Sequence, residues 1–529
     1  MSYTSITFIC FLLVTGIAYF LVPRRVQWGV LLAASLGFYV LSCGARTLFL
    51  VAACGVLYSA GLLIGHLANG FAARKKELAK EERKALKKAV TRQKKIVVSC
   101  AVLLVLLMLL GTKYFNFFGA IGNDISAFFG MGAPIPVLKI LMPLGISYYT
   151  LMGISYIVDV YRGTAKAEKN PLMLLLYLCY FPHIIEGPFD RYTRLTSQFR
   201  TPHPFDYDRM ANGGIRLIWG LFKKFVIADR AGLIVNTIFA DPGSYGGSVQ
   251  FAAILLYTFQ IYAEFSGCMD MVCGVSQMFG VDIAENFKRP FFAVSINDFW
   301  RRWHITLGEW LKDYIFYPVS LSSHFQTLNE RLRRRIKSEH LTTLLPSAYA
   351  LFFVWFANGM WHGASGKYIF YGLYYYALMM LGQALRPLSA KILARLYIPR
   401  ESRGYHAFEI LRTGLIVCFG MMIFRADTLQ QAWSMFQSIF TRFEAAQLFD
   451  GTLLVSGIHA SDYVILLAAF CLVFVISLLQ ERGVAIRQKL AGQVLPVRWS
   501  VYFGLLFAFI IFGAYGGDFT NTAFIYGEF

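Results

Sequence analysis

The sequence carries little charge. Of its 529 residues, 15% are Asp, Glu, Lys or Arg and 57% are hydrophobic, whereas an ordinary soluble domain has about 25% charged residues. So little polar surface cannot cover a water-facing exterior, and this excludes a soluble globular protein. We therefore expect the lipid bilayer to be the solvent of this chain. The net charge of +20 then indicates membrane topology rather than nucleic-acid binding.

The cysteines exclude two further classes of protein. There are nine, an odd number, mostly in apolar segments, and no two of them form a CxxC pair. Neither a disulfide framework nor a zinc site is indicated, and we interpret them as small buried hydrophobic residues. No GxGxxG, Walker or HExxH pattern occurs, so the sequence does not indicate an ATP-driven pump. We expect no bound metal and no bound cofactor.

Long apolar runs recur along the chain. The first, 4–22, has no basic segment before it and is followed by Arg24 and Arg25, so we expect an uncleaved membrane helix rather than a signal peptide. The stretches 171–185 and 249–280 are candidates for broken or re-entrant helices. Further runs of about 20 residues, the length that spans a bilayer, lie at 27–44, 47–66, 96–118, 140–160, 213–238, 249–267, 343–362, 367–385, 408–425, 462–480 and 499–516.

The basic residues predict an orientation. The stretch 74–95 contains eleven basic and three acidic residues, and by the positive-inside rule it lies in the cytoplasm. Both termini of the chain are then expected outside. A solvated helix held near anionic membrane lipid is the favoured interpretation of this stretch, with an acidic partner or a phosphorylated donor as the alternative.

Polar groups in apolar surroundings are costly unless they are paired or used, and two such stretches carry carboxylates. In 181–192, two prolines and a glycine break the helix around Glu186. This stretch either lines a cavity or is a helix end with a capping carboxylate. Further on, Glu264 and Asp270 require a buried partner, which we expect to be a cation or an arginine of 286–318. Structural pairing is favoured over catalysis.

The stretch 286–318 holds the densest group of aromatic and charged residues. Ser295 and Asp298 predict the start of an amphipathic helix at the cytoplasmic interface, continuing past His304 with that residue on its buried face. The buried stripe comprises Trp300, Trp303, His304, Leu307, Trp310, Leu311 and Tyr314, at spacings of three and four. The other sides carry Arg301, Arg302, Glu309, Lys312 and Asp313. A lone histidine on such a face is by default a satisfied core residue.

A second histidine ends an apolar run. His362 lies between Trp361 and Gly363, and the glycines on either side allow another chain or a substrate to approach the imidazole closely. A histidine can take a proton from a hydroxyl or thiol near neutral pH, which acyl transfer requires of a general base. Metal binding is the competing interpretation, but no second ligand stands three or four residues away.

Together these stretches resemble the membrane-bound O-acyltransferase (MBOAT) family, in particular the branch of alginate and peptidoglycan O-acetylation proteins and the teichoic-acid D-alanylation protein. The matching motifs, in order, are FPHIIEGPFDRY (181–192), EFSGCMDM (264–271), NFKRPFFAVSINDFWRRWHITLGEWLKDYIFYP (286–318) and MWHGAS (360–365). The resemblance identifies His362 as the catalytic residue and His304 as the second histidine of the site. The candidate substrate-binding residues are Trp300, Arg301, Arg302, Trp303, Trp361, Glu186 and Asp270. For the two arginines, binding of lipid headgroups is favoured over steering of the donor's phosphates.

The fold implied by the resemblance is an all-α polytopic membrane protein with about eleven or twelve transmembrane helices around a central funnel or tunnel, and with amphipathic interfacial helices. We expect one membrane domain over 1–529, in the cell membrane. Its expected parts are N-terminal helices (1–160) with a basic cytoplasmic loop (70–95), a catalytic core (171–385), C-terminal helices (386–516) and an extracytoplasmic tail (517–529).

The resemblance also implies a function. The chain would pass an acyl group, acetyl in the favoured interpretation, from a cytoplasmic thioester (acetyl-CoA or an acyl carrier) across the membrane. An extracytoplasmic partner of the SGNH or Ser-hydrolase type would then acylate an exported polysaccharide or peptidoglycan. The last residues, FIYGEF (524–529), resemble the FIYxxF terminus of this branch, in which Tyr526 carries the acyl group. The alternatives are D-alanyl transfer to teichoic acid and, outside enzymes, a passive exporter of lipid or polysaccharide that uses Glu264 and Asp270.

Overall fold

The secondary structure is helical. The computed structural model describes residues 3–130, 135–138, 141–454 and 458–515, and within these ranges extended pairing is limited to one isolated bridge, between Phe287 and Trp303. Six helical stretches in these ranges are long and apolar enough to cross a membrane: Arg24–Arg74, Lys80–Phe128, Glu339–His362, Arg403–Arg425, Ala460–Glu481 and Leu495–Phe512. The predicted all-α, polytopic membrane architecture is therefore confirmed.

The chain divides into two compact units. The first comprises residues 1–211 and 275–284, and the second comprises 212–274 and 285–529. Helices of the first unit are α1 (Ile6–Leu21), α2 (Gln27–Cys43), α3 (Thr47–Arg74), α4 (Lys80–Leu109), α5 (Phe115–Phe128), α6 (Ile146–Arg162), α7 (Pro171–Cys179) and α8 (Tyr192–Arg200). Helices α9 (Tyr207–Phe222) and α11 (Gly247–Met278) cross the boundary.

The remaining helices belong to the second unit. They are α10 (Asp229–Ala240), α12 (Ile296–Arg302), α13 (Ile305–Leu311), α14 (Tyr317–Ser320), α15 (Ser323–Arg335), α16 (Glu339–His362), α17 (Gly366–Ala384), α18 (Arg386–Arg395), α19 (Arg403–Arg425), α20 (Leu429–Thr441), α21 (Ala460–Glu481), α22 (Ile486–Ala491) and α23 (Leu495–Phe512). Whether the two units behave as the single expected domain stays a prediction.

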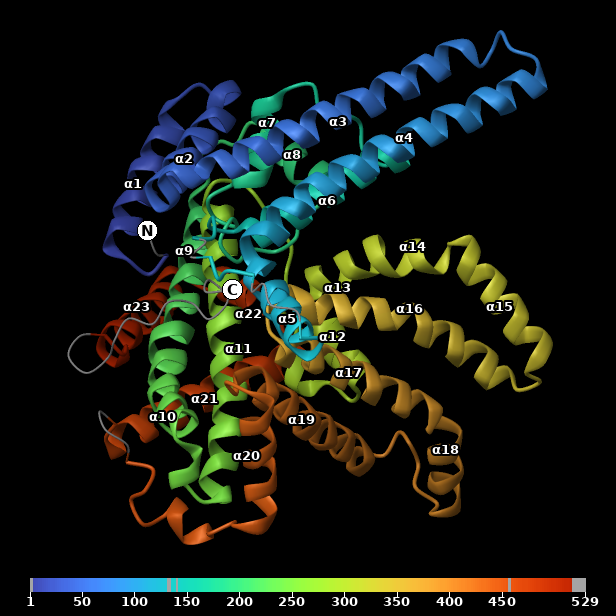
Figure 1. Ribbon diagram of the computed structural model, residues 1–529. Helices are drawn as coiled ribbons and strands as arrows, with labels where there is room; N and C mark the ends of the chain where they lie inside the picture. Colours follow the sequence, from blue (N-terminus) through green and yellow to red (C-terminus); the bar gives the residue numbers. More distant parts are fainter. Residues whose placement is uncertain (1–2, 131–134, 139–140, 455–457, 516–529) are drawn as a thin grey trace. The chain divides into compact units, whose positions relative to one another are not determined.

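Within the first unit, α3 and α4 run side by side as a long hairpin (Figure 1). The basic stretch 74–95 lies at the turn and on the first turns of α4, where its side chains are mostly exposed. Glu82 accepts a hydrogen bond from the backbone N–H of Ala79 at 3.3 Å, and a carboxylate there complements the positive end of the helix dipole. The predicted basic loop is therefore mostly helix.

Within the second unit, α16 and α17 form a second hairpin (Figure 1), and two glycines set how closely they pack. A Cβ atom on Gly359 would collide with the carbonyl oxygen of Tyr368, and one on Gly372 would collide with that of Trp355. The segment that approaches Gly359 is thus α17 of the same protein, and the one that approaches Gly372 is α16.

A widened helical turn joins α9 to α10. Residues Lys223–Ala228 form a π-helix within one continuous helical run, a feature often found at functional sites. The backbone crosses α11 closely, since a Cβ on Gly267 would lie 2.9 Å from the carbonyl oxygen of Gly220. The C-terminal end of α23 is tied to the same segment, because the N–H of Ala514 donates to the carbonyl of Phe225 at 2.9 Å.

The nine cysteines are all free thiols, as expected, but only six of them are buried. Cys10, Cys100 and Cys471 lie on exposed faces of α1, α4 and α21. The interpretation as small buried residues is correct for the other six.

The α16–α17 contact can be tested with a matched pair of substitutions. Gly359→Ala places a methyl group against the Tyr368 carbonyl, and overpacking of this kind costs about 1–3 kcal/mol. Gly382→Ala, on α17, meets open space and should be neutral or stabilising by roughly 0.5–1 kcal/mol. Thermal unfolding of the detergent-solubilised protein measures both. Equal melting temperatures for the two variants would contradict the packing.

Candidate active site

His362 occupies the last position of α16. Its side chain is buried, and three aromatic rings surround it at centroid distances of 4.9 Å for Trp361, 5.6 Å for Tyr371 and 5.3 Å for Phe424. These rings come from α16, α17 and α19. An enclosure of this composition has a low local dielectric constant, which strengthens any charge interaction that develops inside it.

His304 lies at a break between two short helices, not in the continuous helix that the sequence predicts. Helix α12 ends at Arg302 and α13 begins at Ile305, and His304 between them has φ 49° and ψ 49°. A non-glycine residue in this left-handed region is uncommon and costs of order 1–3 kcal/mol, and such residues cluster at active sites. The predicted start of the first helix is confirmed, since Ser295 Oγ accepts from the N–H of Asp298 at 3.1 Å.

A neighbouring segment, residues 286–288, fixes this break. The N–H of Lys288 donates to the carbonyl of Arg302 at 2.8 Å, and the N–H of Ile305 donates to that of Asn286 at 3.1 Å. These two hydrogen bonds flank the Phe287–Trp303 bridge. Because the pairing partners are distant in sequence, no local helical pattern reveals the break.

Both histidines contact the same indole ring. The ring of Trp361 lies 5.4 Å from that of His304 and 4.9 Å from that of His362. On its other side His304 packs edge-on against Phe265 of α11, at 4.9 Å. His304 lies outside the spanning stretches, and burial lowers its pKa to about 3, so its imidazole is neutral near pH 7. The structure thus gathers His304, Trp361 and His362 into one aromatic cluster, which we call the two-histidine cluster.

The predicted substrate-binding residues near His304 have different surroundings. Trp303 is 2% exposed and stacks on Phe299, and Trp300 packs edge-on against Trp355. Arg302 pairs with Asp298 at 3.1 Å and with Glu481 at 2.9 Å, whereas Arg301 is exposed. Substrate binding by these side chains stays a prediction, with Arg301 the more accessible of the two cations.

The buried carboxylates have found partners, but not in the segment that we expected. Asp270 pairs with Arg216 at 2.8 Å and with Lys223 at 2.6 Å, and Glu264 pairs with Lys224 at 3.0 Å. These cations come from α9 and the π-helical segment, not from 286–318. Of the two expected partners, a cation is therefore correct and an arginine of 286–318 is wrong, because the crossing of α9 and α11 determines the partners. The feature of the sequence that could have predicted these partners is the pair of adjacent lysines, Lys223 and Lys224, within the apolar run 213–238.

The ion pairs continue beyond α11. Arg216 also forms a two-pronged pair with Glu285, at 2.8 and 2.6 Å, and Lys224 pairs with Asp229 at 2.8 Å. Arg230 pairs with Asp462 of α21 at 2.8 Å and donates to the Phe512 carbonyl at 2.8 Å. We call this set of ion pairs the buried ionic network. Its members are Arg216, Lys223, Lys224, Asp229, Arg230, Glu264, Asp270, Glu285 and Asp462. The four cations are buried, whereas the Glu285 side chain is exposed.

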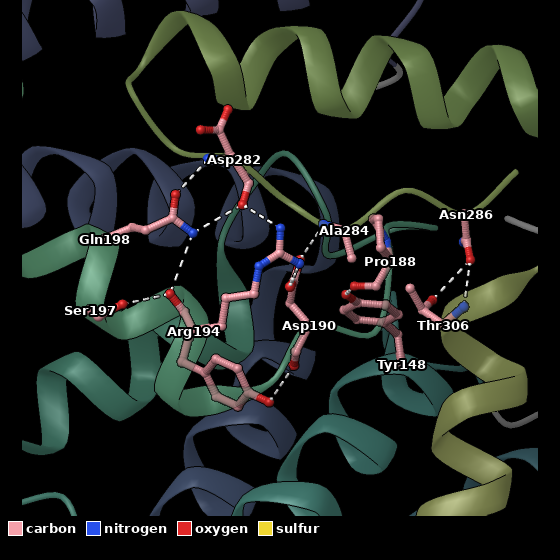
Figure 2. Close-up of polar contacts among 11 residues, drawn as sticks. Tyr148, Pro188, Asp190, Arg194, Ser197, Gln198, Asp282, Ala284, Asn286 and Thr306 are labelled. Carbon is pink, nitrogen blue, oxygen red and sulfur yellow. Dashed lines mark hydrogen bonds and ion pairs between the residues drawn. The ribbon is translucent and has the colours of Figure 1, made fainter. Parts of the chain in front are cut away.

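The stretch 181–192 belongs to the first unit. It is irregular between α7 and α8, as predicted from its prolines, and Glu186 is buried within it. Asp190 anchors the stretch, since its carboxylate pairs with Arg194 at 2.7 Å and accepts from the N–H of Ala284 at 2.8 Å (Figure 2). A substrate-binding role for Glu186 stays a prediction. Tyr526 lies outside the described residues.

The structure is thus that of a helical, multi-pass membrane protein in which a buried histidine at the end of a spanning helix, His362, shares an indole contact with a buried histidine at a helix break, His304. A family model of membrane-bound O-acyltransferases matches residues 167–332. A teichoic acid D-alanyltransferase of Bacillus subtilis is 31% identical over 296 residues, which are 55% of this chain and 70% of that protein. The chain belongs to the membrane-bound O-acyltransferase family.

Other relatives carry two further names. A probable alginate O-acetylase of Pseudomonas aeruginosa is 35% identical over 331 residues, 62% of this chain and 57% of that protein. A peptidoglycan O-acetyltransferase of Helicobacter pylori is 30% identical over 262 residues, 45% of this chain and 46% of that protein. The match spans 57–61% of the length of the first three alginate relatives.

The buried ionic network predicts a large effect of removing one charge. Asp270→Asn leaves Arg216 and Lys223 without their shared carboxylate, and breaking a buried pair in this way costs about 3–5 kcal/mol. Adding Lys223→Met in the same chain should recover part of the loss, because one uncompensated cation is removed. Thermal unfolding measures both variants, with Glu401→Gln, an exposed carboxylate, as the control. A melting temperature of Asp270→Asn equal to that control would contradict the pairing.

Proposed function

We propose that this chain is a membrane O-acyltransferase. The observation that supports the proposal best is the two-histidine cluster, in which His304 and His362 are both buried and both contact Trp361. The relatives named for O-acetylation and D-alanylation place the chain among proteins that handle acyl groups. In this proposal the acyl thioester is a substrate.

The proposed reaction is a direct acyl transfer. A hydroxyl acceptor gives its proton to the imidazole of His362, assisted by His304, as its oxygen attacks the carbonyl carbon of the thioester. The tetrahedral intermediate collapses, the C–S bond breaks, and the thiolate takes the proton back from the imidazolium. The products are an ester and a free thiol. The aromatic walls of the two-histidine cluster keep water from competing with the acceptor.

The proposal includes a direction across the membrane. The basic residues of 74–95 favour a cytoplasmic position for the α3–α4 turn, and the donor, acetyl-CoA in the favoured version, would approach from that side. Both termini would then lie outside. Tyr526 would be the first acceptor, and an extracytoplasmic partner of the Ser-hydrolase type would move the acyl group to an exported polysaccharide or peptidoglycan.

A second version changes only the donor. A D-alanyl group on an acidic carrier protein would dock on the basic cytoplasmic residues, and the acceptor polymer would be teichoic acid, as in the name of the Bacillus subtilis relative. The non-enzymatic alternative, an exporter that uses Glu264 and Asp270, is disfavoured because both carboxylates are held by lysine or arginine.

The role of His362 can be measured on purified protein in lipid nanodiscs. With radiolabelled acetyl-CoA as donor, His362→Ala should lower acyl transfer by about 100- to 10,000-fold, the range attributed to general-base catalysis. His406→Ala, which alters an exposed histidine of α19, is the matched control and should transfer at the wild-type rate. Transfer by His362→Ala at the rate of that control would refute the proposed role.

The same assay separates the two donors. Labelling from acetyl-CoA and none from a D-alanyl carrier protein supports the first version, and the reverse result supports the second. If the wild-type chain accepts an acyl group from neither donor, the proposed function itself fails.

Tyr526 has a test of its own. Tyr526→Phe removes the only oxygen that the residue can offer as a nucleophile, so no acyl group can be attached there, whereas thioester binding should be unchanged. The measurement is mass spectrometry of the C-terminal peptide after incubation with donor, together with donor affinity. Tyr515→Phe is the control at a neighbouring tyrosine. An acylated C-terminal peptide in the Tyr526→Phe variant would remove this residue from the scheme.

A further inference from the structure

The Asn286 side chain faces the break at His304. Asn286 is 1% exposed, and its backbone carbonyl accepts from the N–H of Ile305. Its side-chain oxygen accepts from the backbone N–H of Thr306 at 3.0 Å and from Thr306 Oγ1 at 2.9 Å (Figure 2). The same oxygen lies 3.3 Å from His304 Nδ1. The amide oxygen of Asn286 therefore lies within hydrogen-bonding distance of three groups of the turn: the Thr306 N–H, Thr306 Oγ1 and His304 Nδ1.

The orientation of this amide is fixed by chemistry. A backbone N–H can only donate, so the Asn286 atom that faces the Thr306 N–H must be the oxygen and not the nitrogen. The amide nitrogen then points toward Met269 Sδ, at 3.3 Å, and sulfur is a weak acceptor. Both ends of the amide have a matching partner in this orientation, and the flipped one would set two donors against each other.

The orientation of the amide decides which nitrogen of His304 carries the proton. An amide oxygen cannot donate, so His304 Nδ1 must be the donor in the contact between them. A neutral imidazole has a single N–H. Nδ1 therefore holds the hydrogen, and Nε2 presents a lone pair, the form that can accept a proton.

The buried ionic network holds Asn286 in place. Arg216 donates hydrogen bonds to both carboxylate oxygens of the preceding residue, Glu285, at 2.8 and 2.6 Å. Arg216 is itself paired with Asp270 of α11 at 2.8 Å. A planar two-pronged pair of this kind restricts orientation as well as distance. The segment that carries Asn286 is thus fixed from the side of α9 and α11.

We propose that Asn286 is a positioning residue that sets the tautomer of His304, with the proton on Nδ1 and with Nε2 as a proton acceptor in the reaction. This proposal rests on the proposed acyl transfer for its catalytic meaning, but the tautomer itself does not depend on it. In the opposite tautomer Nε2 would carry the hydrogen and could not take a proton from an acceptor hydroxyl or from a thiol. An amide oxygen in this position thus determines what the second histidine of the two-histidine cluster can do.

The tautomer can be observed directly. Solid-state NMR of the full chain in lipid, with ¹³C- and ¹⁵N-labelled histidine, distinguishes the two neutral tautomers, and the signal that disappears in His304→Gln identifies His304. At pH 8 the wild-type signal should be that of the Nδ1–H form. Asn286→Leu should convert it to a mixture or to the Nε2–H form, whereas Asn286→Asp, which keeps an acceptor oxygen, should preserve it. Thr306→Val, which keeps the backbone N–H, should also preserve the tautomer.

Activity provides the second readout. Asn286→Leu should reduce acyl transfer about 100-fold, the lower end of the contribution of general-base catalysis, and Asn286→Asp should restore at least a tenth of the wild-type rate. Size-exclusion profiles and melting temperatures of the two variants show whether both remain folded. If both are folded and equally inactive, or if Asn286→Leu leaves the tautomer unchanged, the proposal is wrong.

The two proposals fail in different ways. A wild-type chain that transfers no acyl group refutes the proposed function, while the NMR comparison still decides whether Asn286 sets the tautomer. An active wild-type chain with the Nε2–H form at His304 refutes the role of Asn286 alone. Should Asn286→Leu not accumulate, Asn286→Asp and Thr306→Val still report the tautomer.

Discussion

The second unit depends on one constraint, which is that a charge buried in an apolar interior must be paired. Taking an ion out of water costs several kcal/mol even after relaxation, and this chain buries four cations along α9, the π-helical segment and α10. Each of them pairs with a carboxylate from another part of the chain, including α11, Glu285 and α21. Because each pair requires its two elements in contact, the pairs define the arrangement of these helices more sharply than apolar packing alone would.

The two-histidine cluster benefits from that rigidity. The aromatic rings that contact its two histidines come from α11, α16, α17 and α19, and glycine contacts let the backbones of α16 and α17 approach closely. The strained backbone of His304 persists only because the paired segment 286–288 and the side chain of Asn286 hold it. The order of dependence therefore runs from the ionic network, through Glu285 and Asn286, to the histidine.

The features that could be predicted from the sequence are those governed by short-range patterns. The apolar runs predict the membrane helices, Ser295 predicts the start of a helix, and the prolines of 181–192 predict a break between helices; the structure contains all three. The break at His304 could not be predicted, because 302–305 read as a continuous helical stripe and the pairing that interrupts it comes from residues 286–288. The partners of Asp270 were missed for the same reason, since Arg216 and Lys223 lie about fifty residues before it and only the crossing of α9 and α11 joins them. Asn286 begins a recognisable motif, but its role depends on which of its side-chain atoms faces the Thr306 N–H, and only the three-dimensional structure shows this.

The widened turn at Lys223–Ala228 has one more consequence. In a regular α-helix each residue is rotated about 100° from the one before it, and a π-helical turn adds one residue and so offsets everything that follows. The helical run from Tyr207 to Ala240 is therefore continuous, but the side chains after the π-helical turn are rotated about the helix axis relative to those before it. Up to the first residue of the π-helical segment, the helix presents Arg216 and Lys223 to α11, and after that segment Arg230 is turned toward α21. Because of this one extra residue, charged side chains of the same continuous helix can pair with α11 and with α21, which pack against different sides of it.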